Sequence, residues 1–138
     1  MISGAAVDVR VLGQLLLMQS VVTSLPDSAI LPFVVQGLGD VPGVGRVEFH
    51  AEPLAVSPFR LRLVAGATDY GTLDFSVADA VVFAPYLNYI RNFVFMLSVI
   101  LDERRQRQII ERHEHELEQQ VAKRTAELHR ALGQLAVF

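Results

Sequence analysis

Apolar residues recur at steps of three and four from about residue 8 to residue 24, which predicts an amphipathic helix. A second helix is expected to begin at Pro26 and to end in the glycine-rich segment 37–45. Pro32 is compatible with that helix if it falls in the first turn, where backbone N–H groups have no intrahelical partner. One stripe of the first helix is expected to face the core, and the open alternative is that it also contacts a second subunit. This stripe consists of Val11, Leu15, Met18, Val22 and Leu25.

Strict alternation of polar and apolar side chains then indicates strands. Residues 46–51 alternate in this way, and so do residues 59–64 and 72–76. The segment 66–71 contains two glycines and predicts the turn of a β-hairpin between the last two strands. The buried side of this hairpin is expected to consist of Leu61, Leu63, Leu73 and Phe75.

Helical spacing returns from residue 79 to residue 101, with two parallel apolar stripes. A helix that is apolar over so much of its circumference is expected to be buried on more than one side. The sheet covers one side, and the other is expected to meet the same helix of a second chain, with a wholly intrachain core as the alternative. One stripe is Val82, Tyr86, Tyr89, Phe93, Met96 and Ile100, and the other is Phe83, Leu87, Ile90, Val94, Leu97 and Leu101.

No helix-breaking residue follows Asp102 until Gly133, so the helix is expected to continue. Steps of three and four mark a coiled-coil seam at Ile110, His113, Leu117, Val121, Arg124, Leu128, Ala131 and Leu135. The two consecutive steps of four at 113–117–121 are a local stutter in this seam. Because an isolated helix of this length is marginal in water, the segment is expected to need a partner helix, most simply its own copy.

Composition divides the chain at the same place. Of the 138 residues, 51% are hydrophobic and 20% are charged, which is typical of a folded protein. Residues 1–102 carry 5 Lys and Arg against 9 Asp and Glu, a net charge of −4, whereas residues 103–138 carry 7 against 6, a net charge of +1. We therefore expect a compact domain over 1–102 and a helical extension over 103–138.

The chain has no cysteine, which excludes disulfides, thiolate metal ligands and cysteine nucleophiles. Its longest apolar run near the middle, residues 93–101, is shorter than the roughly 20 residues that cross a bilayer. No basic leader precedes the first leucines. We therefore expect no membrane insertion, no signal peptide and a cytoplasmic location.

The order of these elements resembles that of a GAF domain. The closest likeness is the segment from Phe59 to Phe83, an apolar strand, a turn, a second strand and the start of the final helix. Its second strand, Gly71-Thr-Leu-Asp-Phe-Ser76, is similar to the G-x-L-x-[LF] strand that precedes the last helix of GAF domains. Segments 24–28 and 44–48 fit the same pattern, and the likeness covers most of residues 10–101. It implies an α+β fold in which a small antiparallel sheet packs with N-terminal helices and a long C-terminal helix. With only eight residues between Ala51 and Arg60, the member it implies is shortened and lacks the excursion that caps the ligand pocket.

A second resemblance lies in the helical extension. Residues 117–128 read Leu-Glu-Gln-Gln-Val-Ala-Lys-Arg-Thr-Ala-Glu-Leu. They resemble the LE-x-x-V-x-x-RT-x-EL linker that joins sensor domains to output domains in bacterial histidine kinases and diguanylate cyclases. This resemblance implies a parallel two-chain signalling helix and a covalently linked output domain outside this sequence.

Residues that could carry catalysis are sparse. His113 and His115 are two residues apart, so on a helix they point to different sides and do not share a metal ion. His115-Glu116-Leu117 resembles the opening of a histidine-kinase phosphoacceptor box but continues without Arg-Thr-Pro. No phosphate-binding loop or serine-nucleophile motif is present. We expect no catalytic residue, no metal and no cofactor. His50 is expected to face solvent or to be hydrogen-bonded, and His115 to be a solvated residue of the coiled coil.

A group of arginines before the seam also invites a basic-zipper interpretation. Glu103 and Glu111 dilute the positive charge, and the preceding domain is acidic. Binding to DNA needs a denser basic array facing the phosphates. We expect no nucleic-acid partner and assign a solvated, salt-bridged helix face to Arg104, Arg105, Arg107 and Arg112.

These patterns and resemblances predict a non-catalytic regulatory module of a bacterial signal-transduction protein. It is expected to form a parallel homodimer and to relay a conformational change through its coiled coil to a histidine kinase or diguanylate cyclase output domain. The alternatives are a purely structural dimerisation domain and, after that, a sensor for a small metabolite or nucleotide. The predicted dimer interface consists of Val11, Leu15, Met18, Val22, Tyr86, Tyr89, Phe93, Met96, Ile100, Ile110, Leu117, Val121 and Leu128.

Overall fold

The computed structural model describes residues 7–52, 55 and 59–136, and the chain divides into two units, 1–102 and 103–138. The first unit is an α+β domain with a small three-stranded antiparallel sheet, and the second is helical. The predicted α+β class, the small antiparallel sheet and the long C-terminal helix are confirmed. The boundary between the units falls where the composition of the sequence changes.

Two helices open the first unit, α1 (Val9–Val22) and α2 (Asp27–Leu38). The side chain of Asp8 caps α1 by accepting a 2.9 Å hydrogen bond from the backbone N–H of Arg10. The two helices approach closely at Gly37, where an added Cβ would lie 2.5 Å from Cε of Met18. A side chain at this position would require the flexible end of Met18 to shift.

Pro32 does not lie in the first turn of α2, contrary to the sequence expectation. Since α2 begins at Asp27, Pro32 is inside the helix, and its missing N–H removes the i+4 donor for the carbonyl of Ser28. Pro32 and Ser28 are both exposed, so this gap in the helical ladder lies on the solvent side, where water can supply a donor.

The sheet consists of β1 (Val44–His50), β2 (Arg60–Ala65) and β3 (Thr68–Val77) in the order β1-β3-β2. Both pairings are antiparallel, and Leu73 in the central strand faces Phe49 on one side and Leu61 on the other. The predicted hairpin between β2 and β3 is present, but its turn is shorter than the predicted 66–71 because β3 already begins at Thr68.

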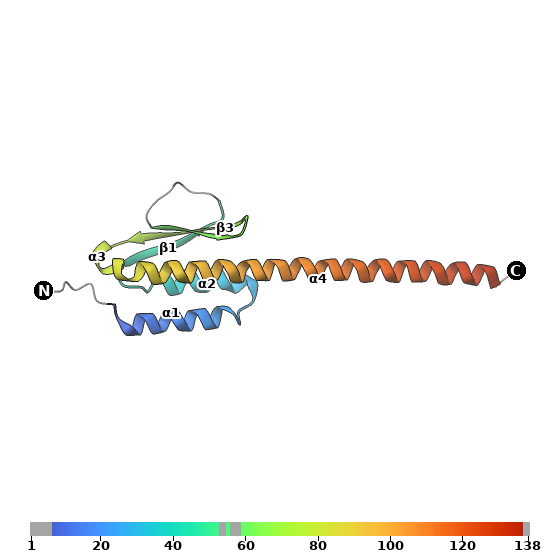
Figure 1. Cartoon of the computed structure of the whole chain (residues 1–138), viewed down its shortest axis with the longest axis horizontal. Coiled ribbons are helices and arrows are strands. Elements are labelled where there is room, and N and C mark those ends of the chain that lie inside the picture. The colour runs from blue at the N-terminus through green and yellow to red at the C-terminus, as the bar shows by residue number, and fades with distance from the viewer. Residues whose placement is uncertain (1–6, 53–54, 56–58, 137–138) are drawn as a thin grey trace. The chain divides into compact units, whose positions relative to one another are not determined.

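One face of the sheet covers the hydrophobic core, which α2 and the first part of α4 complete, and α1 lies on the far side of those two helices (Figure 1). Of the four hairpin residues predicted to be buried, Leu63, Leu73 and Phe75 are buried and Leu61 is partly buried against the core. The fully buried side chains of this core include Val22, Ile30, Val34, Leu38, Leu63, Leu73, Phe83, Ile90, Phe93 and Leu97.

The helix predicted from residue 79 is interrupted near its start. A short helix, α3 (Ala80–Phe83), is capped by Asp79, and a 3-10 turn (Ala84–Tyr86) follows before α4 (Leu87–Ala136). Pro85 accounts for the interruption, because its ring fixes the backbone and removes one N–H donor. Residues 87–102 of α4 belong to the first unit and the remainder of α4 to the second.

Candidate functional site

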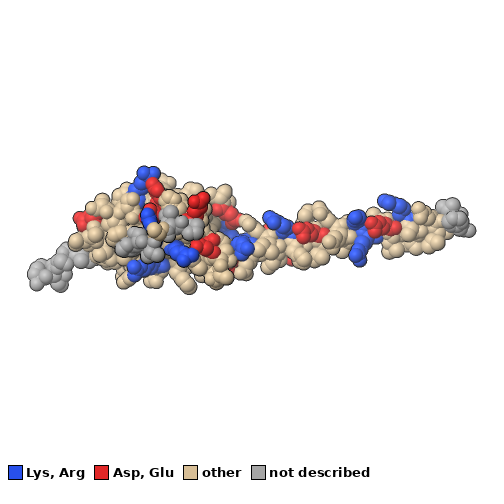
Figure 2. Space-filling model, turned by 90° about the horizontal axis from the view of Figure 1, so that it is seen from above, with Lys and Arg blue, Asp and Glu red and all other residues tan. Residues whose placement is uncertain are grey.

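The helix of the second unit has no buried face. Every side chain that the structure describes from residue 105 to residue 135 is exposed to solvent. Acidic and basic side chains are interspersed along this segment, and Glu103 and Arg107 form an i,i+4 ion pair (Figure 2). Such surface pairs contribute only a few tenths of a kcal/mol to an isolated helix, so ion pairs alone do not explain a helix of this length.

Apolar side chains nevertheless form a stripe along this exposed helix, which we call the seam stripe: Ile110, Leu117, Val121, Leu128 and Leu135. They follow one another at steps of seven, four, seven and seven residues and are 46% to 69% exposed. Seven residues are two helical turns, so these side chains share one side of the helix, with the step of four marking the stutter. Two further apolar side chains, Ile109 and Leu132, are exposed beside the stripe.

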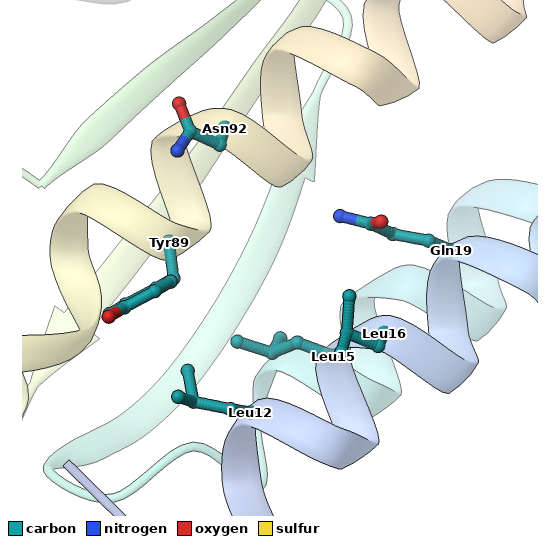
Figure 3. A pocket seen from close by; sticks show the side chains of 6 residues that line it. All are labelled: Leu12, Leu15, Leu16, Gln19, Tyr89 and Asn92. Atoms are coloured by element: carbon teal, nitrogen blue, oxygen red, sulfur yellow. The ribbon is translucent and has the colours of Figure 1, made fainter. Parts of the chain in front are cut away.

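A second exposed apolar surface lies in the first unit, between α1 and α4. Leu12, Leu15, Leu16 and Gln19 of α1 and Tyr89 and Asn92 of α4 line an open pocket of about 230 Å³ (Figure 3). Leu16 is 63% exposed, and Phe95 and Val99, further along α4, are also exposed. We use the name α1–α4 surface for the pocket lining, the exposed side chains of α1, and Phe95 and Val99 of α4.

The α1–α4 surface is almost free of charge. Residues 11–26 contain no charged residue, and neither do residues 92–101 of α4. The pocket itself is smaller than the roughly 300 Å³ at which pockets for small molecules usually begin. Its lining is mainly apolar, with Gln19 and Asn92 as polar members.

The predicted interface residues differ in how much of each side chain is exposed in a single chain. Tyr89 and the four predicted residues of the second unit are exposed, and Met96 and Ile100 are half-buried. The other six are buried in the core of the first unit of a single chain, so their burial does not require a partner: Val11, Leu15, Met18, Val22, Tyr86 and Phe93. The dimer interface stays a prediction, and the exposed neighbours Leu16, Phe95 and Val99 were not among its predicted members.

The outer face of the sheet carries paired charges. Arg60 lies 3.4 Å from the carboxylate of Asp74, and Arg62 pairs with Asp69 at the tip of the hairpin. The hydrogen bond from Arg62, followed by that from the N–H of Gly71, lowers the pKa of the Asp69 carboxyl below its usual 3.8. These pairs are structural contacts between adjacent strands.

The histidines do not converge on one another. Nε2 of His50 lies 3.2 Å from the carboxylate of Glu48 on the same strand, and the other three histidines are exposed on the helix of the second unit. Within the described part of the chain, no group of three histidine, aspartate or glutamate side chains is arranged to hold a metal ion.

One helical segment, Ala80–Leu135, is long enough and over part of its length apolar enough to cross a membrane, with a mean hydropathy of 1.3 in its most apolar window. A single such helix is weak evidence for a membrane span, because core helices of soluble proteins meet the same criterion, and 33% of that window is buried inside the protein. A cytoplasmic location stays a prediction.

No protein-family model matches this chain, and no curated protein or solved structure is significantly similar to it. Its function has to be argued from its own residues.

Proposed function

We propose that this chain is a non-catalytic regulatory module that forms a parallel homodimer and relays conformational changes along a two-chain coiled coil. The observation that carries the proposal is the exposed seam stripe of the second unit. Burying a Leu, Ile or Val side chain contributes about 1.5–3 kcal/mol, and the helix leaves five such side chains in water. A second copy of the same helix would bury all five at once.

The α1–α4 surface supports a dimer contact that begins in the first unit. Starting from Tyr89, steps of three and four run through Asn92, Met96 and Val99 and reach Ile110 in the same register. An uncharged surface offers nothing to a strongly charged partner, whereas two copies of it are complementary to each other. We infer that the α1–α4 surface is part of the contact with the second chain.

We propose a parallel arrangement because the resemblance of residues 117–128 to the linker of signalling proteins implies it. In a parallel pair, each seam stripe meets its own copy in the same register, so its five exposed side chains are covered together.

The role as a signal relay rests on two resemblances, the GAF-like order of elements in the first unit and the linker motif at 117–128. Under this proposal, the coiled coil passes a change in packing to an output domain such as a histidine kinase or diguanylate cyclase. A stutter locally unwinds a coiled coil, and we propose that the stutter at 113–121 allows two packings of the seam that lie close in energy. We assign no ligand to the module, and its predicted cytoplasmic location agrees with the burial of Phe93 and Leu97 in a protein core.

Sedimentation equilibrium of the wild-type chain tests the proposal. We expect twice the chain mass of 15.3 kDa at micromolar concentration, with the mass independent of salt because the contact is apolar. A monomer over the whole micromolar range would refute the proposal.

A further inference from the structure

The strand β3 contains a bulge at Tyr70. Leu63 of β2 pairs with Gly71, but the next residue, Val64, pairs with Asp69, so Tyr70 is an inserted residue in this ladder. An inserted residue reverses the alternation of side chains between the two faces of a sheet. Asp69 therefore reaches Arg62 on the outer face, and Tyr70 is directed to the opposite side, toward α4.

The local sequence holds this bulge in place. The carboxylate of Asp69 accepts a 2.9 Å hydrogen bond from the backbone N–H of Gly71 and pairs with Arg62. Gly71 has a φ of +122°, and a Cβ there would lie 2.5 Å from the ring of Phe49. Only glycine fits that position, so the bulge is a built feature of the hairpin.

The result of the bulge is a hydrogen bond between the hairpin and α4. The Tyr70 hydroxyl donates to Oδ1 of Asp102 over 2.6 Å, and both residues are half-buried. This distance is in the range of a hydrogen bond to a charged oxygen, which is about twice as strong as a neutral one. Tyr70 packs against the core of the first unit, and so do Ile100 and Leu101, the two residues of α4 directly before Asp102.

Asp102 is the last residue of the first unit, and the side chains of residues 105–135 are exposed. We propose that the Tyr70–Asp102 hydrogen bond is a clamp between the hairpin tip and the final turn of α4 in the domain. Through this hydrogen bond, a change in the conformation of the hairpin tip alters the conformation of α4 next to the start of the proposed coiled coil. Tyr70 and Asp102 are thus positioning residues, and this inference rests on the proposed relay function.

Hydrogen exchange tests the clamp itself. Tyr70→Phe keeps the ring and removes the hydroxyl, so we expect amide exchange in residues 99–106 to become about tenfold faster or more, the scale of a hydrogen bond to a charged group. The matched control is Tyr86→Phe, which removes the hydroxyl that accepts from the backbone N–H of Asp8 over 2.9 Å. The control should leave exchange in residues 99–106 unchanged. Equal exchange in Tyr70→Phe and wild type would overturn the clamp.

A double-mutant cycle separates the clamp from a general loss of stability. Asp102→Ala should raise exchange in the same segment, and the double variant should exchange no faster than Asp102→Ala alone, because Asp102→Ala already removes the bond that Tyr70→Phe removes. Additive effects of the two substitutions would mean that the residues act independently and would contradict the proposal. Circular dichroism on each variant reports whether the domain has remained folded.

The rate of disulfide cross-linking between the two chains of the dimer tests whether the clamp affects the coiled coil. The chain has no native cysteine, so Ile110→Cys gives a single reporter on the seam stripe. We expect Tyr70→Phe to change the rate of disulfide formation at this position severalfold while the sedimenting mass stays that of a dimer. An unchanged rate would reduce the bond to a structural contact and refute the relay. A wild-type monomer would refute the proposed function instead, and the exchange experiment would still decide the clamp.

Discussion

At the scale of single residues, Asp69 links the two strands of the hairpin at its tip. The Arg62 side chain, and then the Gly71 N–H, favour the ionised carboxylate and lower the pKa of Asp69 below 3.8. A carboxyl whose pKa is lower in the folded chain contributes stability at pH values above its unfolded pKa. This contribution is lost as the pH falls through the folded pKa. The hairpin tip should therefore loosen only in strongly acidic solution, below about pH 3.8.

The pKa of Asp69 can be followed directly by NMR titration of its carboxyl carbon. We expect Arg62→Met to raise that pKa toward 3.8, since it removes the largest cause of the shift. Arg60→Met is the matched control, because Arg60 pairs with Asp74 and not with Asp69. If the pKa of Asp69 were the same in Arg62→Met and in wild type, the ion pair at the tip would not form in solution.

Gly71 carries the second residue-level prediction. An alanine there would need a positive φ and would place its Cβ 2.7 Å from the carbonyl oxygen of His50. We expect Gly71→Ala to destabilise the domain by about 2 kcal/mol or more. Gly66→Ala, at a φ of +60° with open space around it, should cost only about 1 kcal/mol. Thermal denaturation compares the two, and a smaller loss at Gly71 than at Gly66 would contradict the observed bulge.

At the scale of elements, α4 is the core helix of the first unit over residues 87–102. Val94 is 4% exposed, whereas Val81, in α3, is 70% exposed. Removing two buried methyl groups should cost about 2 kcal/mol, so we expect Val94→Ala to lower the free energy of unfolding by that amount. Val81→Ala should change it by less than about 0.5 kcal/mol. Urea denaturation gives both values, and equal effects would mean that Val94 is not part of the core.

The helix of the second unit allows a similar comparison of two leucines. Leu128 lies on the seam stripe, and Leu132 lies one turn further on and beside it. Leu128→Lys removes two buried leucines from the proposed dimer and brings two like charges together, so the Kd should rise at least about tenfold. Leu132→Lys should change the Kd much less. Equal effects in sedimentation velocity would show that the seam stripe is not the contact.

Most elements of the fold could be predicted from the sequence because periodicity and turn residues agree along it. The two N-terminal helices and three strands lie close to their predicted places. The break before α4 was missed, although Pro85 signals it. The bulge at Tyr70 could not have been predicted, since it depends on which residues of β2 and β3 face each other. That register is set by packing across the whole sheet.

At the scale of the whole molecule, a sequence pattern identifies apolar stripes but not what covers them. The stripe of α1 through Leu15 and Met18 is covered by the chain's own domain, whereas Leu16 and Phe95 are left exposed. Covered and exposed apolar residues cannot be told apart in the sequence, because the placement of elements distant along the chain decides which of them are buried. The structure thus separates the apolar residues that the domain covers from those that it leaves exposed.

The central claim is a parallel dimer joined along the seam stripe, and disulfide trapping tests it most directly. Leu135→Cys places a single cysteine near the end of the described helix, where it is remote from its own copy in an antiparallel pair. Under mild oxidation at micromolar concentration, the account predicts nearly complete conversion to a disulfide-linked dimer that retains the circular dichroism of the wild type. Chains that remain unlinked under the same conditions would contradict the parallel dimer.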